Sequence, residues 1–275
     1  MSALIRSSVS TKQLFDRRPL VVAGISTVVL SAFLITPGDI ASKTHMALHG
    51  LCAQRPSHSL QIGGVTLPMD ARMTGIYLGA ATTIIWLGAA RRLRANRMPS
   101  LSVVVLLASF VLALGIDGFN ALLVDLHAPT LYEPSNIIRL GSGVLAGTSL
   151  GVAIGHLFAS SVWSYGDRDR AVVAKPAELL VPIGVSGVIA VLALSDFSLL
   201  YAPIAIGLLL AVVGTFWFLG IVLLALLSQR GWSYDSWTDL APLAVTSLIA
   251  AMATVSALAS LRFAAEQFLG LPRLT

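Results

Sequence analysis

The residues with the most reactive side chains lie at the borders of long apolar segments. In LPMDARMTGIYLG, residues 67–79, Asp70 and Arg72 stand directly against the start of an apolar run. A charge costs about 2.5 to 3.5 kcal/mol if it reaches the bilayer centre, so its presence there needs a structural or functional reason. Other polar residues flank the neighbouring apolar runs. The whole candidate polar network consists of Arg55, Ser59, Asp70, Arg72, Tyr77, Asp117, Asn136 and Arg139.

Two kinds of chemistry are open to this network. Arg72 and Arg139 could bind a phosphate or carboxylate, with Asp70 or Asp117 as general base. The same residues could instead form ion pairs that fix the helix ends, and we favour this structural interpretation. Residues two apart on a helix point away from each other. We therefore expect Arg72 to face Asp117, and Asp70 to cap the first helical turn or to meet Arg55 or Arg139.

Arg139 lies one turn inside a helix for which Ser135 is the expected N-cap. An arginine at this depth needs a partner. The candidate partners are the carboxylates expected on the same side of the membrane, namely Asp70, Asp117 and Glu133. An ion-pair network of this kind would join three helices at their outer ends.

A second group of reactive side chains precedes these residues. In DIASKTHMALHGLCAQ, residues 39–54, His45, His49 and Cys52 follow one another at i, i+4 and i+7, which is one face of a short helix. With His58 they could form a metal site, but the HExxH spacing is missing and histidines near headgroups are common. We expect no metal and no cofactor.

The composition places these residues in a membrane protein. Of 275 residues, 56% are hydrophobic and only 11% are charged, and the mean hydropathy is +0.85. Soluble domains carry about a quarter charged residues. The net charge of +5 resides in short loops beside apolar segments, which indicates membrane topology and argues against nucleic-acid binding. A single cysteine, Cys52, excludes an intrachain disulfide and a thiolate zinc site.

Apolar segments long enough to cross a bilayer predict the fold class. At 1.5 Å per residue, about 20 residues span a hydrocarbon core of about 30 Å. The sequence predicts an all-α, polytopic bundle of about seven membrane helices, at residues 19–36, 74–90, 101–117, 137–160, 179–195, 199–227 and 240–263. A tight helical hairpin at Asp196 would separate the fifth helix from the sixth.

The predicted domain organisation follows from these segments. Residues 1–18 form a cytoplasmic N-terminal segment, and residues 19–160 a membrane region. Residues 161–275 add three further helices and a short tail. The first apolar segment could be a signal peptide, but no A-x-A cleavage site follows it, and we interpret it as a membrane helix.

The distribution of basic residues predicts the orientation. Cytoplasmic loops carry an excess of Lys and Arg. With the N-terminus inside, twelve of the eighteen basic residues are cytoplasmic: Arg6, Lys12, Arg17, Arg18, Arg91, Arg92, Arg94, Arg97, Arg168, Arg170, Lys175 and Arg230. We therefore expect a multi-pass protein of the prokaryotic cell membrane with its C-terminus outside.

The first outer loop, residues 37–73, is too long for a simple connector. Its first part predicts a short helix, and SLQIGGVTLP, residues 59–68, predicts two strands joined at Gly63 and Gly64. The sequence thus predicts a small folded cap. In the following membrane region, glycines at 141, 143, 147, 151 and 155 predict close approach of the fourth helix to a neighbour.

These motifs also resemble a known family. LCAQRPSHSLQIGGVTLPMDARMTGIYLG, then IDGFNAL and PSNIIRLGSGVLAGTSLG, are similar to the bacterial and archaeal membrane proteins grouped as domain of unknown function 2085. In that family the first stretch typically reads C-H-Q, R-S and L-P-x-C-A-R-C-T-G-I-Y-x-G, and the later one D-G and S-T-N-x-L-R-x-x-T-G. The resemblance covers about residues 45–155 and implies an architecture but no reaction.

The chain departs from the family pattern where that pattern has cysteine and histidine. Asp70 and Met73 replace the two cysteines of C-A-R-C, Ala53 replaces the histidine of C-H-Q, and Cys52 is retained. Any thiol or metal chemistry that the family's residues imply could not proceed here in the same way. The retained polar positions are Arg55, Ser59, Arg72, Tyr77, Asp117, Asn136 and Arg139.

Three classes of function remain open from the sequence. The first is a non-catalytic scaffold or accessory subunit, whose partners are the bilayer and other membrane subunits. The second is an outer-leaflet enzyme acting on a lipid-linked substrate through the Arg/Asp site. The third is a transporter of a small solute. It has the least support, because the last three helices carry few polar residues, chiefly Ser186, Thr215, Thr246, Thr254 and Ser256.

Overall fold

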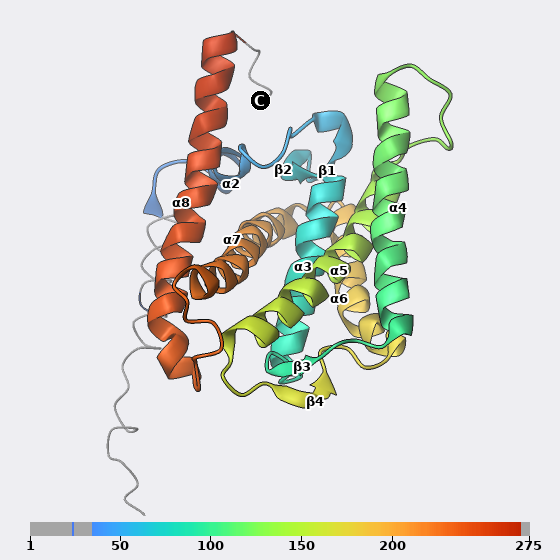
Figure 1. Ribbon diagram of the computed structural model, residues 1–275. Helices are drawn as coiled ribbons and strands as arrows, with labels where there is room; N and C mark the ends of the chain where they lie inside the picture. The colour runs from blue at the N-terminus through green and yellow to red at the C-terminus, as the bar shows by residue number, and fades with distance from the viewer. Residues whose placement is uncertain (1–23, 25–34, 271–275) are drawn as a thin grey trace, which may run out of the picture.

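A computed structural model describes residues 24 and 35–270 (Figure 1). The predicted cytoplasmic segment 1–18, almost all of the first predicted helix and the last five residues lie outside the described part. The described part is largely helical, and the all-α class is confirmed. Its helices are α2 (Ile40–Leu48), α3 (Ala71–Ala89), α4 (Leu101–Asp125), α5 (Asn136–Val162), α6 (Leu180–Leu194), α7 (Tyr201–Leu227) and α8 (Trp237–Leu269).

Helices α3 and α5 form the centre of the bundle and pack backbone against backbone. A Cβ atom on Gly75 would lie 2.7 Å from the Val144 nitrogen, and one on Gly147 would lie 2.8 Å from the Ile76 carbonyl carbon. Gly79, Gly143, Gly151 and Gly155 have similarly close neighbours across the helix pair or beside it. The predicted close approach is confirmed, except that Gly141 faces open space.

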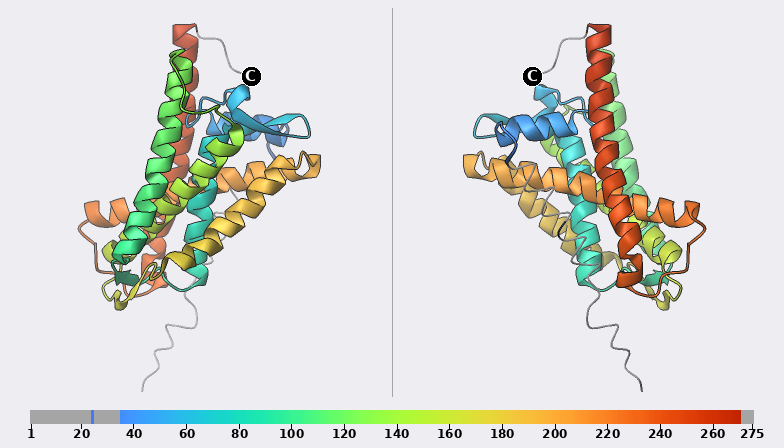
Figure 2. Two further views of the ribbon diagram at one scale, coloured as in Figure 1. Left: turned by 90° about the vertical axis from the view of Figure 1, so that its right-hand side faces the viewer. Right: turned by 90° about the vertical axis from the view of Figure 1, so that its left-hand side faces the viewer.

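The remaining helices surround this pair (Figure 2). Helices α4 and α8 run steeply along one side, whereas α6 and α7 slope away from them. Few α4 side chains are buried; the buried ones are Val103, Asp117 and Asn120. Most of the α4 surface is thus left for lipid.

The two ends of the bundle carry different small structures (Figure 1). At one end lies the cap: α2, the 3-10 helix η2 (Pro56–His58), and the antiparallel strands β1 (Ser59–Ile62) and β2 (Val65–Asp70). Gly63 and Gly64 form the turn with φ of 59° and 76°, which glycine adopts freely. The predicted helix and hairpin are confirmed. The opposite end has a parallel pair, β3 (Ala95–Arg97) and β4 (Asp167–Ala171), that the sequence did not predict.

Of the about seven expected membrane helices, the one at residues 19–36 lies almost entirely outside the described residues, which leaves six to compare. Five helical segments of the described residues are long and apolar enough to cross a membrane: Leu101–Asp125, Asn136–Val162, Pro176–Leu194, Ser198–Leu227 and Trp237–Leu269. Helix α3 is not among them, although it runs between the same two ends (Figure 1). Its hydropathy is lowered by Arg72, glycines and threonines. It tolerates them because α5, α6 and α7 pack around it.

Two predicted helix boundaries are wrong. Helix α4 was expected to end at Asp117 but continues to Asp125, because Asp117 is paired inside the bundle and does not need water. Helix α2 ends at Leu48, with His49 as its C-cap, so Cys52 does not lie on the same helix as His45. The predicted turn at Asp196 is present, with a φ of 54° between α6 and the 3-10 helix η4 (Ser198–Leu200).

Candidate functional site at the cap end

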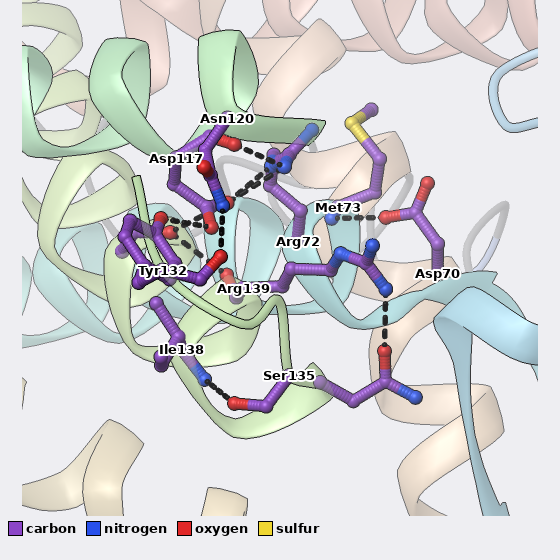
Figure 3. A network of polar contacts seen from close by, with 11 residues as sticks. Asp70, Arg72, Met73, Asp117, Asn120, Tyr132, Ser135, Ile138 and Arg139 are labelled. Atoms are coloured by element: carbon purple, nitrogen blue, oxygen red, sulfur yellow. Dashed lines mark hydrogen bonds and ion pairs between the residues drawn. The ribbon is translucent and has the colours of Figure 1, made fainter. Parts of the chain in front are cut away.

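Asp117 is the centre of the polar network (Figure 3). Its side chain is 3% exposed, and Oδ2 accepts hydrogen bonds from Arg72 Nε at 2.9 Å and Nη2 at 2.7 Å. Ser142 Oγ on α5 donates to the same oxygen at 3.3 Å, and Tyr132 donates its hydroxyl to Oδ1 at 2.9 Å. The predicted contact between Arg72 and Asp117 is confirmed. The contact joins α3 to α4, and Ser142 adds α5.

Hydrogen bonds also hold the loop between α4 and α5 next to Asp117. Asn120 donates from Nδ2 to the Tyr132 carbonyl at 2.9 Å and accepts from the Leu131 nitrogen at 2.8 Å. Burial of the Tyr132 hydroxyl and its bond to Asp117 raise the pKa of Tyr132 above its ordinary value. Three members of this network, Asn120, Tyr132 and Ser142, were not predicted from the sequence. The signal for Asn120 was its spacing from Asp117, which puts both on the buried face of α4.

Asp70 caps α3, as predicted. Its Oδ1 accepts from the Met73 nitrogen at 2.8 Å. Its Oδ2 accepts from the thiol of Cys52, with 3.3 Å between sulfur and oxygen, while the Asp70 nitrogen donates back to that sulfur at 3.2 Å. Burial, and then the charge of Asp70, raises the pKa of Cys52 to about 11. The retained cysteine therefore acts as a buried hydrogen-bonding group that holds the cap loop to α3.

Arg139 does not join the ion-pair network as predicted. Its Nη1 donates to Asn136 Oδ1 at 2.9 Å, and within the described chain no carboxylate lies within 4.0 Å of it. The reason is geometric, because Arg72 and Ser142 already occupy Oδ2 of Asp117 and Tyr132 occupies Oδ1. Asn136 in turn donates to the carbonyls of Ser57 and Ser59, at 3.3 Å each, and so ties α5 to the cap.

The other three predicted network residues have separate roles. Arg55 pairs with Asp125 at 3.4 Å on the surface, where both side chains are about half exposed. The Ser59 hydroxyl donates to the Arg55 carbonyl at 3.0 Å. Tyr77 is buried in an apolar cluster with Leu48, Cys52 and Met69, away from the charges.

His45, His49 and Cys52 do not converge on one point. His45 Nε2 contacts the Thr66 carbonyl at 2.8 Å, His49 contacts Glu266 at 2.8 Å, and Cys52 contacts Asp70. In the described part of the chain, no group of three or more His, Cys, Asp or Glu residues could hold a metal ion. His45 instead joins α2 to β2 within the cap, His49 joins the cap to α8, and Cys52 joins the cap loop to the N-cap of α3.

The link from His49 to α8 was missed from the sequence. Gln54 donates from Nε2 to the carbonyls of His45 and Pro68, at 2.9 Å each. The other amide atom, Oε1, lies 3.0 Å from His49 Nδ1 and can only accept, so His49 Nδ1 carries the proton and donates it. Glu266 accepts from Arg262 Nε at 2.8 Å on its other oxygen. Arg262 and Glu266 are four apart, which is the signal that could have indicated this anchor.

Part of the chain is similar to known proteins. Residues 52–153 match the family described as predicted membrane protein, domain of unknown function 2085. A protein of Methanothermobacter thermautotrophicus, described as uncharacterized, is 29% identical over 110 residues, which are 39% of this chain and 86% of that protein. No solved structure matches the chain.

The matched segment starts at Cys52, includes the hairpin, α3 and α4, and ends within α5. It therefore contains the Arg72 and Asp117 pair, the Asp70 cap and most of the glycine contacts between α3 and α5. Over residues 52–153 the chain is similar to the membrane proteins of domain of unknown function 2085, with Asp70 and Met73 in place of the cysteines of the family pattern.

Proposed function

We propose that this multi-pass membrane protein is a non-catalytic scaffold or accessory subunit, and that its cap is a docking surface for another membrane subunit. The observation that carries the proposal is the attachment of the cap at three separate places. Asn136 of α5 donates to the cap carbonyls of Ser57 and Ser59, and His49 links the cap to α8. The Gly63 nitrogen donates to Asp196 Oδ1 at 2.6 Å, in the turn between α6 and α7. A cap held in this way presents one fixed surface, which specific docking requires.

The engagement of the carboxylates supports a structural role over catalysis. Asp117 accepts hydrogen bonds from Arg72, Tyr132 and Ser142, and Asp70 accepts from Met73 and Cys52. A general base needs a free lone pair within reach of a substrate proton. Asp117 is buried with both oxygens engaged, and Asp70 is held as the N-cap of α3, so the outer-leaflet enzyme has less support than the scaffold.

The hydroxyl groups within the helices also give little support to a transporter. Thr215, Thr246 and Thr254 each donate to the carbonyl four residues earlier in their own helix, at 2.7 to 3.0 Å. Ser186 pairs with Thr82 at 2.6 Å. Their hydrogen bonds are satisfied within the bundle, whereas a solute pathway would need such groups to face a cavity.

We further propose that the cap end faces outward and that the N-terminus is cytoplasmic. Strands β3 and β4 lie at the end opposite the cap (Figure 1). The described basic residues of the proposed inner loops belong to this end, from Arg91 to Arg97 and from Arg168 to Lys175. Positive charge on one side of a bundle supports a cytoplasmic assignment for that side.

Purification in a mild detergent with mass spectrometry of the complex tests the scaffold function. We expect one protein partner in a fixed molar ratio. The partner should be lost when exposed apolar residues of the cap are made acidic, as in Met46→Glu with Val65→Glu, which are 53% and 40% exposed. Tyr165→Glu, at an 83% exposed position at the other end, is the matched control and should retain it. Absence of any partner, or equal loss in both variants, would contradict the proposal.

A further inference from the structure

Arg139 differs from the other arginines that the structure describes at the cap end. Arg72 has Asp117, Arg262 has Glu266 and Arg55 has Asp125 within 4.0 Å. Arg139 is only 7% exposed, yet within the described residues its guanidinium has one hydrogen-bond acceptor, Asn136 Oδ1. A buried charge without a counter-charge is costly, which indicates that a further anionic group belongs there.

The nearby carboxylate of Asp70 does not fill this role. Figure 3 shows Arg139 and Asp70 on the same side of the network, but they form no ion pair. The Asp70 carboxylate is directed at the Met73 nitrogen and the Cys52 thiol, and neither of its oxygens lies within 4.0 Å of a guanidinium nitrogen of Arg139. A guanidinium has five N–H donors in a planar fork, so most donors of Arg139 remain available.

The cap segment next to Arg139 contains two further basic residues, Arg55 and His58. This segment, Arg55–Ser59, is held by the two hydrogen bonds of Asn136. Burial, and then the positive charges of Arg139 and Arg55, lower the pKa of His58 below its ordinary value. The charges of Asp70 and Asp125 act on the pKa of His58 in the opposite direction, so groups of both signs lie near this histidine.

The depth of Arg139 matches that of lipid headgroups. Arg139 belongs to the first turn of α5, and its neighbours Ile137 and Ile138 are 64% and 43% exposed. Exposed isoleucines at the start of a membrane-spanning helix mark the edge of the hydrocarbon region. Phosphate groups of the outer leaflet lie just beyond this edge.

We propose that Arg139, which is buried and has no carboxylate within 4.0 Å among the described residues, binds one phosphate group. Arginine is well suited to phosphate because its fork donates two parallel, charge-assisted hydrogen bonds. The phosphate belongs either to a phospholipid headgroup or to free phosphate, and both offer the same oxygens. Phosphate binding at this site does not depend on the docking of a partner. The scaffold proposal can therefore be wrong while the phosphate proposal holds.

Two measurements on the full-length protein distinguish the sources. Inorganic phosphate is titrated into delipidated protein in a maltoside detergent while thermal unfolding is followed, with chloride at equal ionic strength as the reference. In parallel, the protein is placed in nanodiscs that contain phosphatidylglycerol and is then released from them. Native mass spectrometry shows whether one lipid molecule stays bound to the protein. Stabilisation by phosphate alone identifies free phosphate, and one retained lipid identifies a headgroup. Neither effect in the wild type would overturn the proposal.

Substitutions then locate the site. Arg139→Gln should weaken binding roughly ten- to a hundredfold, because it removes charge-assisted hydrogen bonds. Arg139→Lys, which keeps the charge but loses the fork, should bind with intermediate affinity. Arg168→Gln, on exposed β4 at the opposite end, is the control and should bind like the wild type. Equal binding by Arg139→Gln and the wild type would overturn the assignment.

A structural role for Arg139 predicts a different result. Without lipid or phosphate, Arg139→Gln removes an uncompensated charge and should unfold at the wild-type temperature or above it. A clear loss of stability under these conditions would show that the protein already supplies a counter-charge, and would overturn the proposal. Phosphate should also raise the pKa of His58 in an NMR titration of the wild type, but not of Arg139→Gln.

Discussion

The position of Asp117 in the structure differs from the position that the sequence predicted. Together with Gly118 it was expected to end a helix, but it lies two turns before the end of α4 and is almost completely buried. Its partner Arg72 could be predicted, because an arginine at the membrane edge needs a carboxylate on the same side. Tyr132 and Ser142 could not, because no charge or periodicity marks a hydroxyl as a ligand of a particular carboxylate.

Arg139 and the two cap histidines illustrate the same limit. The sequence indicated that Arg139 needs a carboxylate, but it could not show that Arg72 already occupies Asp117. The spacing of His45, His49 and Cys52 suggested one shared helical face, but α2 ends at Leu48, before Cys52. Competition for a partner and the exact end of a short helix depend on tertiary contacts, which local patterns do not contain.

Cys52 gives a prediction at the scale of one side chain. Because its pKa is raised to about 11, the reactive thiolate is scarce near neutral pH. We expect a maleimide to leave the folded protein unmodified at pH 7 to 8 and to label it fully after denaturation, as read by mass spectrometry. Prompt labelling of the native protein at pH 7 would contradict the buried contact with Asp70.

The same pKa shift predicts the direction of a pH effect on stability. The folded protein holds the thiol proton up to about pH 11, whereas the ordinary value is 9.0. Between these values the folded state binds more protons than the unfolded state, so the contribution of Cys52 to stability falls as the pH rises. Cys52→Ser should show a smaller decline than the wild type in unfolding measured from pH 9 to 11.

At the scale of elements, the packing of α3 on α5 is the best-predicted feature. Spacing of four between small residues on one helix predicted a close approach, and the structure supplies Gly75 and Gly79 as the opposing surface. The β3 and β4 pair could not be predicted, because ANR and DRDRA have no alternating apolar pattern. Their pairing follows from the position of two loops at the same end of the bundle.

A matched pair of glycine substitutions on α5 tests this packing. A Cβ on Gly147 would collide with the backbone of Ile76, so Gly147→Ala should destabilise the protein by about 1 to 3 kcal/mol. Gly141 has open space around it, and Gly141→Ala should be neutral or stabilising by up to about 1 kcal/mol, through helix propensity. Unfolding in detergent measures both. Equal effects would show that the two helices are not in backbone contact.

At the scale of the whole molecule, hydropathy predicted the membrane helices well. In the described residues it overestimated their number by one, because α3 is not long and apolar enough to count as a membrane span. Helix α3 is less apolar than its neighbours because its environment is mainly protein. The segment that matches the family, residues 52–153, contains this helix and its partner α5, whereas α6, α7 and α8 lie beyond it. Most of the predicted polar residues fall in this segment, because it carries the contacts between cap and bundle.

The proposed orientation can be tested with introduced cysteines on intact cells. Gln61→Cys in the exposed hairpin should react with a membrane-impermeant maleimide, and Tyr165→Cys at the opposite end should react only after lysis. Native Cys52 is buried and should give no background. The reverse labelling pattern would place the cap in the cytoplasm.

Arg72 and Asp117 form a structural pair that locks the start of α3, directly after the last strand of the cap, to α4. A double-mutant cycle of Arg72→Ala and Asp117→Asn, measured by unfolding in detergent, tests this pairing directly. Arg72→Ala leaves a buried carboxylate unpaired and should cost about 3 to 5 kcal/mol. The double variant should be less destabilised than the sum of the single variants, by about 1 to 3 kcal/mol. The exposed pair of Arg55 and Asp125 is the control, with an expected coupling of about 0 to 1 kcal/mol. Strictly additive losses at Arg72 and Asp117 would contradict this pairing.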